Sequence, residues 1–312
     1  MLDFSNNNNA LHELFRECGI VLFDSAMGTS LISLDLPARV RSEAVNALDP
    51  EAVKTIHRAN IAAGADVITT NTFGISSVLA GEARGGDFAG GLELLRAGVA
   101  CARSAAEGSS GGHIKVALDI GPTGRIVELS DDLTHEEAIR VFAAQAEAGE
   151  AAGADLILIE TMTDLAELED ALTAAKAACA LPALCTMTFE ESGRSFMGAD
   201  PVSFARAAEA LGAAAVGVNC TLAPKEIAGI VRAIAGEASL PVIVQPNAGR
   251  PVMIGGKQIF EMDPSVFAAD AAALADAGAA LIGGCCGTTP EMIALLSDIL
   301  TEGGKRKKRR PQ

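Results

Sequence analysis

Two adjacent cysteines, Cys285 and Cys286, lie in a glycine-rich segment near the end of the chain. On a regular strand their side chains would point to opposite faces, but the glycines on either side permit backbone conformations that turn both sulfurs towards one point. Cys220, which follows the apolar run 215–218, can supply a third sulfur. Zinc binds thiolate sulfurs tetrahedrally, and a site with three protein ligands keeps one position for substrate. The three cysteines therefore predict a zinc site with an open position.

Such a site indicates thiol chemistry, because zinc keeps a bound thiol in its nucleophilic thiolate form. Hydrolytic zinc sites more often use His and carboxylate ligands, so three sulfurs favour alkyl transfer to a thiol. A structural zinc would normally have four protein ligands, and no histidine of the chain offers itself as a fourth, although Asn247 could fill that position at rest. Three buried thiols without a metal, a zinc hydrolase and a non-catalytic zinc-binding barrel remain as alternatives.

Two carboxylates, Asp24 and Glu160, each follow a predicted strand and have no evident partner in the sequence. They could cap the segments that follow them, since residues 161–164 open a helix, or they could bind the ammonium group of an amino-acid substrate. Gly28, beside Met27, could complement them by presenting backbone N–H groups to a carboxylate. The predicted ligand is therefore a small amino acid that carries a thiol.

The elements that must position these residues alternate between short apolar runs and helical patterns. Eight runs are predicted strands: 20–23, 67–70, 114–118, 156–159, 183–188, 215–218, 242–245 and 280–283. The segments between them, rich in Ala, Glu and Leu, include these predicted helices: 50–63, 135–152, 164–178, 201–211 and 263–276. Continuous apolar strands joined by helical crossovers indicate a parallel sheet buried on both faces.

A Gly-Ala-Asp or Gly-Ala-Ala phrase precedes four of these strands, and its glycine would end the preceding helix. The phrases lie at 64–66, 153–155, 212–214 and 278–280. Eight βα units without a break in composition predict an α/β fold that is a single (β/α)8 TIM barrel. A doubly wound open sheet is the alternative, but no G-x-G-x-x-G motif follows the first strand.

Active sites of TIM barrels lie where the strands end in βα loops. The chemically unusual residues of this chain collect at such positions: Asp24, Asn71, Asp119, Glu160, Asn219, Cys220, Gln245, Asn247, Cys285 and Cys286. Polar groups from at least six segments would thus meet on one face. We expect catalysis at the three cysteines and substrate contacts from seven residues: Asp24, Met27, Gly28, Asn71, Glu160, Asn219 and Asn247.

The chain has 312 residues and a net charge of -16. This charge argues against a nucleic-acid surface, which needs clustered Lys and Arg, and no apolar run approaches the roughly 20 residues that span a bilayer. An odd set of seven cysteines and an N-terminus without a signal-peptide layout predict a cytoplasmic protein with reduced thiols. We expect the barrel to span residues 20–302, between an N-terminal extension (1–19) and a basic disordered tail (303–312).

Several of these segments resemble the homocysteine S-methyltransferase family, over about Ile20 to Leu300. The similar segments are 24–29, 64–66, 70–73, 160–161, 217–220 and 283–289. Within the family, three further segments are most similar to the homocysteine-binding module of cobalamin-dependent methionine synthase: 121–125, 193–195 and 245–249. Position 25 departs from the pattern, because it is Ser where the family usually has Gly or Ala.

The resemblance implies a (β/α)8 barrel in which Cys220, Cys285 and Cys286 hold zinc, while Asp24 and Glu160 lie near the amino group of the substrate. It implies methylation of L-homocysteine to L-methionine. Because the folate barrel and the corrinoid-binding domain of the full synthase are absent, we expect the methyl group to come from methylcobalamin on a separate corrinoid protein. A free sulfonium donor, S-methylmethionine or S-adenosylmethionine, is the alternative.

Overall fold

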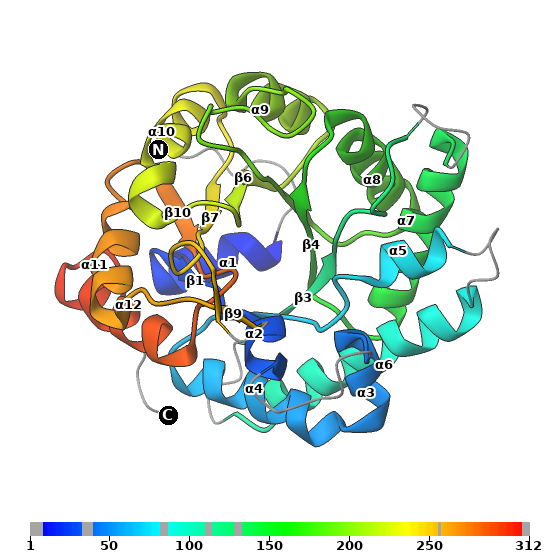
Figure 1. Cartoon of the computed structure of the whole chain (residues 1–312), viewed down its shortest axis with the longest axis horizontal. Helices are drawn as coiled ribbons and strands as arrows, with labels where there is room; N and C mark the ends of the chain where they lie inside the picture. Colours follow the sequence, from blue (N-terminus) through cyan, green and yellow to red (C-terminus); the bar gives the residue numbers. More distant parts are fainter. Residues whose placement is uncertain are drawn as a thin grey trace.

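The computed structural model describes residues 9–32, 40–81, 87–109, 114–127, 133–254 and 257–307. Eight parallel strands form one sheet in the order β1-β10-β7-β6-β5-β4-β3-β2, and a parallel bridge between Phe23 and Val67 joins its two ends. Helices surround this ring (Figure 1), which confirms the predicted single (β/α)8 barrel. The strands are β1 (Val21–Leu22), β2 (Val67–Thr69), β3 (Lys115–Ile120), β4 (Leu156–Met162), β5 (Ala183–Met187), β6 (Ala215–Asn219), β7 (Val242–Gln245) and β10 (Ala279–Ile282).

Helices fill the connections between these strands, and several of them begin at polar caps that the sequence supplies. Asp200, for example, accepts the N–H groups of Val202 and Ser203, and Pro201 occupies the first helical position, where its missing N–H costs nothing. A hairpin of β8 (Val252–Ile254) and β9 (Lys257–Ile259) follows β7. The helices are α1 (Asn9–Cys18), α2 (Met27–Ile32), α3 (Val45–Leu48), α4 (Pro50–Ala62), α5 (Ile75–Leu79), α6 (Phe88–Glu107), α7 (His135–Ala151), α8 (Leu165–Ala178), α9 (Pro201–Ala210), α10 (Pro224–Glu237), α11 (Pro264–Ala273) and α12 (Pro290–Glu302).

Side chains along the strands alternate between the barrel interior and the surrounding helices, with the period of two that a strand imposes. In β4, Leu156 and Leu158 belong to the interior cluster, whereas Ile157 and Ile159 pack with residues of the helices. The interior cluster is apolar, and its strand residues include Val67, Ala117, Leu158, Leu184 and Ile243. Two residues further along, the same strands and their ends carry inward polar side chains: Thr69, Asp119, Glu160, Thr186 and Gln245. This polar layer forms the floor of the candidate site.

The turn before β2 is built around Asp66, which is fully buried. Gly64 has a φ of 102° and ends α4 in the left-handed conformation. Two residues later, the carboxylate of Asp66 accepts the N–H of Leu22 in the neighbouring strand at 2.8 Å. Arg306 forms a two-pronged ion pair with this carboxylate and donates to the Gly64 carbonyl at 2.8 Å. The aspartate therefore joins β1, the helix end and the C-terminal segment.

The turn before β4 repeats this arrangement with residues from other elements. Gly153 has a φ of 97°, and Asp155 accepts the N–H of Val116 at 2.8 Å. Arg103 of α6 pairs with Asp155 and donates to the Gly153 carbonyl. The Gly-Ala-Asp phrase that the sequence analysis assigned to helix ends thus also supplies a carboxylate that binds the adjacent strand.

The segment 303–307 departs from the prediction of a solvated basic tail. Arg306 is only 4% exposed, because the carboxylate of Asp66 compensates its charge. The backbone of this segment is fixed as well: Ile20 donates to Lys305 at 3.1 Å, and Lys307 donates to the carbonyl of Cys18 at 2.8 Å. Residues 308–312 of the predicted tail lie outside the described residues.

The N-terminal helix α1 closes the end of the barrel that lies opposite the strand C-termini. Its residues Leu11, Leu14 and Cys18 are buried in the same cluster as Phe23 and the other interior side chains. In Figure 1, α1 lies across the central opening of the ring. The described part of the segment 1–19 therefore contributes to the barrel core. Among the described residues, no helix combines the length and the apolar character required to cross a lipid bilayer.

Candidate metal and substrate site

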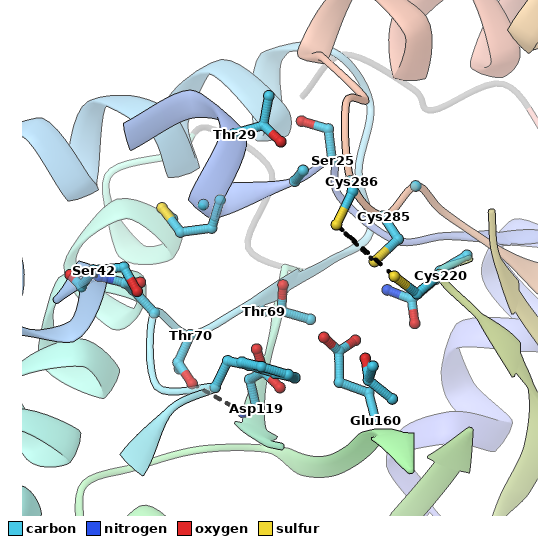
Figure 2. A pocket seen from close by; sticks show the side chains of 18 residues that line it. Ser25, Thr29, Ser42, Thr69, Thr70, Asp119, Glu160, Cys220, Cys285 and Cys286 are labelled. Carbon is cyan, nitrogen blue, oxygen red and sulfur yellow. Dashed lines mark hydrogen bonds between the residues drawn. The ribbon is translucent and has the colours of Figure 1, made fainter. Parts of the chain in front are cut away.

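The sulfurs of Cys220, Cys285 and Cys286 converge at the C-terminal end of the barrel (Figure 2). The Sγ atom of Cys286 lies 3.9 Å from that of Cys220 and 4.0 Å from that of Cys285. All three sulfurs lie within 4.8 Å of one another. Within the part of the chain that the structure describes, this is the only group of three or more His, Cys, Asp or Glu residues close enough to hold a metal ion.

The spacing of the sulfurs fits a tetrahedral metal. Zinc with Zn–S bonds of about 2.3 Å places two of its sulfur ligands about 3.8 Å apart, and the closest observed pair lies at 3.9 Å. Three protein sulfurs leave one tetrahedral position for another ligand. The donor set and its geometry therefore suit zinc.

The charge of the cluster also favours a bound metal ion. Hydrogen bonds from the thiols of Cys285 and Cys286 lower the pKa of Cys220, so that its thiolate carries a negative charge. The hydrogen bonds to Cys220, followed by burial and the charge of its thiolate, raise the pKa of the other two thiols. Without a metal ion, the protein thus stabilises the thiolate form of Cys220 and disfavours ionisation of Cys285 and Cys286. A divalent cation would offset the repulsion and allow all three to ionise.

Two tight loops aim these sulfurs. Cys220 and Thr221 directly follow β6 and adopt left-handed conformations, with φ of 61° and 57°, which non-glycine residues rarely occupy. The Cys220 N–H donates to the carbonyl of Gln245 at 3.0 Å. Such strain is typical of functional sites, where the surrounding structure holds an unfavourable conformation in place.

The second loop carries the cysteine doublet, and its glycines are sterically required. A Cβ on Gly284 would lie 2.4 Å from the Thr288 hydroxyl oxygen, which itself donates to the Cys285 carbonyl at 2.6 Å. Gly287 has a φ of 79°. The N–H of Cys285 donates to the carbonyl of Pro246 at 2.9 Å. These contacts turn both sulfurs to one side, as the sequence analysis expected of the glycine-rich segment.

The sulfurs form one wall of a cavity of about 370 Å³. Glu160 and Asp119 lie on its opposite side (Figure 2). None of the described residues that line it is Lys, Arg or His. The lining residues are Ser25, Ala26, Met27, Gly28, Thr29, Ser42, Thr69, Thr70, Asn71, Phe73, Asp119, Glu160, Thr161, Cys220, Gln245, Gly284, Cys285 and Cys286.

Four of the seven predicted substrate contacts line this cavity, and three do not. Met27, Gly28, Asn71 and Glu160 are lining residues. A Cβ on Gly28 would meet no atom within 4 Å, so open space faces this glycine. The remaining three, Asp24, Asn219 and Asn247, are buried behind the lining.

Asn219 is a positioning residue in this structure. Its Oδ1 accepts the Thr161 N–H at 2.9 Å and the Thr186 hydroxyl at 2.8 Å, and its Nδ2 donates to the Thr161 hydroxyl at 2.7 Å. Thr161 has a φ of 60° and follows Glu160 in the chain. Asn219 therefore fixes the backbone next to Cys220 and next to Glu160.

Asn247 and Asn71 occupy different surroundings. A hydrogen bond from the side chain of Asn247 helps to lower the pKa of Cys220, while its buried Oδ1 atom has no hydrogen-bond partner. The amide of Asn71 donates to the Ser42 carbonyl at 2.6 Å and to Asn46 at 2.9 Å. Asn247 thus lies beside the sulfurs, whereas Asn71 ties the loop after β1 to the loop after β2.

The two predicted carboxylates differ in their contacts. Both oxygens of Asp24 accept hydrogen bonds from Thr69, yet burial raises the pKa of this carboxyl group to about 7. Burial, the charge of Cys220 and the charge of Asp24 raise the pKa of Glu160 to about 8. Glu160 alone of these two reaches the cavity surface.

Several lining residues were absent from the predicted substrate contacts. Asp119, Thr161 and Gln245 face the cavity from β3, β4 and β7, and Phe73 lines it from the loop after β2. The strand period could have identified two of them, because Asp119 and Gln245 lie two residues after the interior residues Ala117 and Ile243. Ser25, the departure from the resembled pattern, also lines the cavity and bonds to Asn60.

Comparisons with known proteins agree with this geometry. The homocysteine S-methyltransferase family profile matches residues 21–300. Methionine synthases from Mycobacterium tuberculosis (strain ATCC 25618 / H37Rv) and Mycobacterium leprae (strain TN) are 33% and 32% identical to this chain over 290 residues. These alignments cover 88% of this chain but 24% of each relative, so the chain spans about a quarter of their length.

Solved structures of similar shape include the metallated form of the homocysteine methyltransferase MmuM from Escherichia coli, with a TM-score of 0.77. It is 27% identical, over 93% of this chain and 100% of that chain. A dihydrodipicolinate synthase, 14% identical with a TM-score of 0.51 over 91% of this chain and 76% of that chain, shares the barrel fold alone. The family profile covers nearly the whole barrel, including all three cysteines. The chain therefore belongs to the homocysteine S-methyltransferase family.

Proposed function

We propose that this chain is a zinc-dependent methyltransferase that converts L-homocysteine to L-methionine with a methyl group from a separate corrinoid protein. The observation that carries the proposal is the position of three converging sulfurs on the wall of a cavity whose opposite side carries carboxylates. A thiol group and an ammonium group separated by a short carbon chain would match these two sides. Homocysteine has this arrangement.

Cys220, Cys285 and Cys286 would hold the zinc ion. When bound there, zinc supplies a Lewis acid that favours the thiolate form of the substrate. The protein contributes the geometry, because Asn219 and the two tight loops hold the sulfurs before any ligand arrives. Asn247, with its unpartnered Oδ1 beside Cys220, is our candidate for the fourth position at rest.

The amino-acid end of homocysteine would lie between Glu160 and the start of α2. Glu160 accepts hydrogen bonds from the ammonium group, and Asp24 adds negative charge from behind Thr69. The first N–H groups of a helix have no partner within it, so those of Met27 and Gly28 are available for the substrate carboxylate. Positioning of this kind contributes much of the rate enhancement of a two-substrate reaction.

In the transfer itself, the homocysteine sulfur attacks the methyl carbon from the side opposite the carrier. The new S–C bond forms as the bond between methyl group and carrier breaks, and the carrier keeps the electron pair. Cavity residues help to exclude water from the nucleophile, since Phe73 and Met27 supply apolar surface to the cavity lining. Asn71 holds the loops that frame this entrance.

The corrinoid donor is proposed because the segments of this barrel resemble those of methionine synthases, which extend well beyond the region matched here. A sulfonium donor is the second candidate. One observation favours it: a cavity with acidic residues and no Lys, Arg or His among its described lining attracts a cation.

The test is methionine formation by zinc-loaded protein given homocysteine and one donor at a time. The donors are free methylcobalamin, a methylated corrinoid protein, S-methylmethionine and S-adenosylmethionine. Activity with the corrinoid donors alone would support the first proposal, and activity with a sulfonium alone would support the second. Cys179→Ser, at the end of α8 and far from the cavity lining, is the control for loss of a thiol. No methionine with any donor would favour the non-catalytic zinc-binding barrel.

A further inference from the structure

Asp119 points into the cavity from the end of β3, and its backbone is held rigidly. It has the same parity along the strand as Ala117, which packs inside the barrel, and the opposite parity to Leu118, which packs against the helices. The Asp119 N–H donates to the hydroxyl of Thr70 at 3.0 Å, and the Asp119 carbonyl accepts from Thr72 at 2.7 Å. The carboxyl group is thus presented at a fixed place on the cavity floor.

The carboxyl group of Asp119 is buried, but one of its oxygen atoms has no hydrogen-bond partner. The residue is only 7% exposed, and its Oδ1 atom has no hydrogen bond. A buried polar atom without a partner costs free energy, and native structures keep few of them. Asp119 also lines the cavity, so a ligand with a hydrogen-bond donor can supply the partner that its carboxyl group lacks.

The charges around Asp119 specify what that donor must be. Burial, followed by the charges of Glu160, Asp24 and Glu43, raises the pKa of Asp119 well above its usual value. No Lys, Arg or His lines the described cavity to offset these carboxylates. Figure 2 shows Asp119 and Glu160 on the same side of the cavity, across from the sulfurs. A cation bound between them would relieve the repulsion and satisfy Oδ1 at once.

We propose that Asp119, together with Glu160, binds the ammonium group of the substrate and thereby selects thiols that carry an α-amino group. This inference rests on the proposed function and adds a specificity determinant to it. An ammonium group has three N–H donors, so one carboxylate does not exhaust it. Asp24 is a weaker second partner, because both of its oxygens already hold Thr69 and it does not line the cavity.

The test compares homocysteine with 4-mercaptobutanoate, which has the same carbon chain, carboxylate and thiol but no amino group. Binding of each to zinc-loaded protein is measured by titration calorimetry, for the wild type and for Asp119→Asn. We expect the variant to bind homocysteine on the order of 10- to 100-fold more weakly, the range typical of a lost hydrogen bond to a charged group. Binding of 4-mercaptobutanoate should stay the same or become tighter.

Asp170→Asn is the matched control, because Asp170 is similarly buried, at 8% exposed, but lies outside the cavity lining. It should leave the ratio of the two affinities unchanged. If Asp119→Asn weakens the binding of both ligands equally, or of neither, Asp119 does not bind the amino group and the inference is wrong. If the wild type binds homocysteine no more tightly than 4-mercaptobutanoate, the site selects no amine and the inference is also wrong. Failure of the wild type to bind either thiol would instead overturn the proposed function.

Discussion

The carboxylate of Asp24 takes the place of a backbone carbonyl in the ring of strands. Its Oδ2 accepts the Thr69 N–H at 2.8 Å, and its Oδ1 accepts the Thr69 hydroxyl at 2.9 Å. Thr69 ends β2, the strand that must pair with β1 to close the barrel, and β1 itself has two residues. The side chain of Asp24 therefore extends a very short strand by one further link. Closure of the barrel and the floor of the cavity depend on the same group.

Asp24→Asn should flatten the pH dependence of stability in metal-free protein. Burial raises the pKa of Asp24 from 3.8 to about 7, so the folded state keeps a proton that the unfolded chain releases. The resulting stabilisation is fully present below pH 3.8 and is lost as the pH rises through about 7. Asn matches the protonated carboxyl group in shape and in donor. Ionisation of Asp24 should lower the free energy of unfolding of the wild type by up to about 4 kcal/mol across this window, and we expect the variant to lack this decrease.

Urea unfolding at several pH values measures this effect after removal of metal with a chelator. Asp298→Asn, which removes an exposed carboxylate, serves as the control and should follow the wild-type curve. Should Asp24→Asn itself retain the wild-type slope between pH 4 and 7, another carboxyl group carries the proton.

The strands of the fold could be predicted from the sequence to within one or two residues at most ends, because each is a short apolar run and most ends are marked by glycine, proline or a polar residue. The run predicted at 67–70, for example, is β2 (Val67–Thr69). The ordered C-terminal segment could not be predicted. Nothing near Arg306 in the sequence reveals that the carboxylate of Asp66, 240 positions away, is buried beside it.

Some features of the candidate site could likewise be predicted from the sequence, and others could not. The convergence of Cys220 with the doublet could be predicted, because parallel strands end on one face and the doublet lies among glycines. To predict which carboxylates face the cavity, the alternation of side chains along each strand must be taken into account as well. Phe23 lies in the interior cluster, so Asp24 points away from the barrel axis, whereas Glu160 lies two residues after the interior Leu158. The left-handed backbone at Cys220 has no sequence signal, since no glycine occupies the position.

Replacing either Cys220 or Cys286 by Ser should abolish stoichiometric zinc binding. Each substitution leaves two sulfurs, and the hydroxyl of Ser is a much poorer ligand than thiolate for zinc. We expect about one zinc per chain in the wild type and a small fraction of that in the variants. Metal analysis of protein purified in zinc-containing buffer measures the ratio. Cys179→Ser should bind zinc like the wild type, and equal zinc in all four proteins would exclude the sulfur cluster as the metal site.

Asn219→Ala should weaken metal binding without removing a ligand. The substitution deletes four hydrogen bonds, two to Thr161, one to Thr186 and one at 4.0 Å to the Sγ atom of Cys285, and frees the backbone from which Cys220 projects. Loss of such a supporting residue typically costs about 10- to 100-fold in metal affinity, and the unpaired buried groups should destabilise the fold by about 2–4 kcal/mol. Competition with a chelator measures the affinity, and urea unfolding measures the stability.

The control for this prediction is Asn46→Ala. Asn46 is also a buried amide, with hydrogen bonds to Asn71 and to the carbonyl of Leu94, but it lies outside the cavity lining. Its loss should reduce stability while zinc affinity changes little. Equal losses of zinc affinity in the two variants would show that general destabilisation, and not the position of Asn219, governs metal binding.

Arg306→Met should destabilise the fold far more than Arg103→Met, although both arginines pair with the aspartate of a Gly-Ala-Asp turn. The side chains of Arg306 and Asp66 are 2% and 1% exposed, whereas those of Arg103 and Asp155 are 26% and 22% exposed. Removing one partner of a buried pair leaves an uncompensated charge and costs about 3–5 kcal/mol, while a pair that keeps about a quarter of each side chain exposed is partly screened by solvent and contributes less. Urea unfolding measures both losses.

The double variant Arg306→Met/Asp66→Asn should recover part of the stability, because Asn keeps an acceptor for the Leu22 N–H without a charge. Equal losses for the two single variants would mean that the C-terminal segment contributes no more than an exposed ion pair.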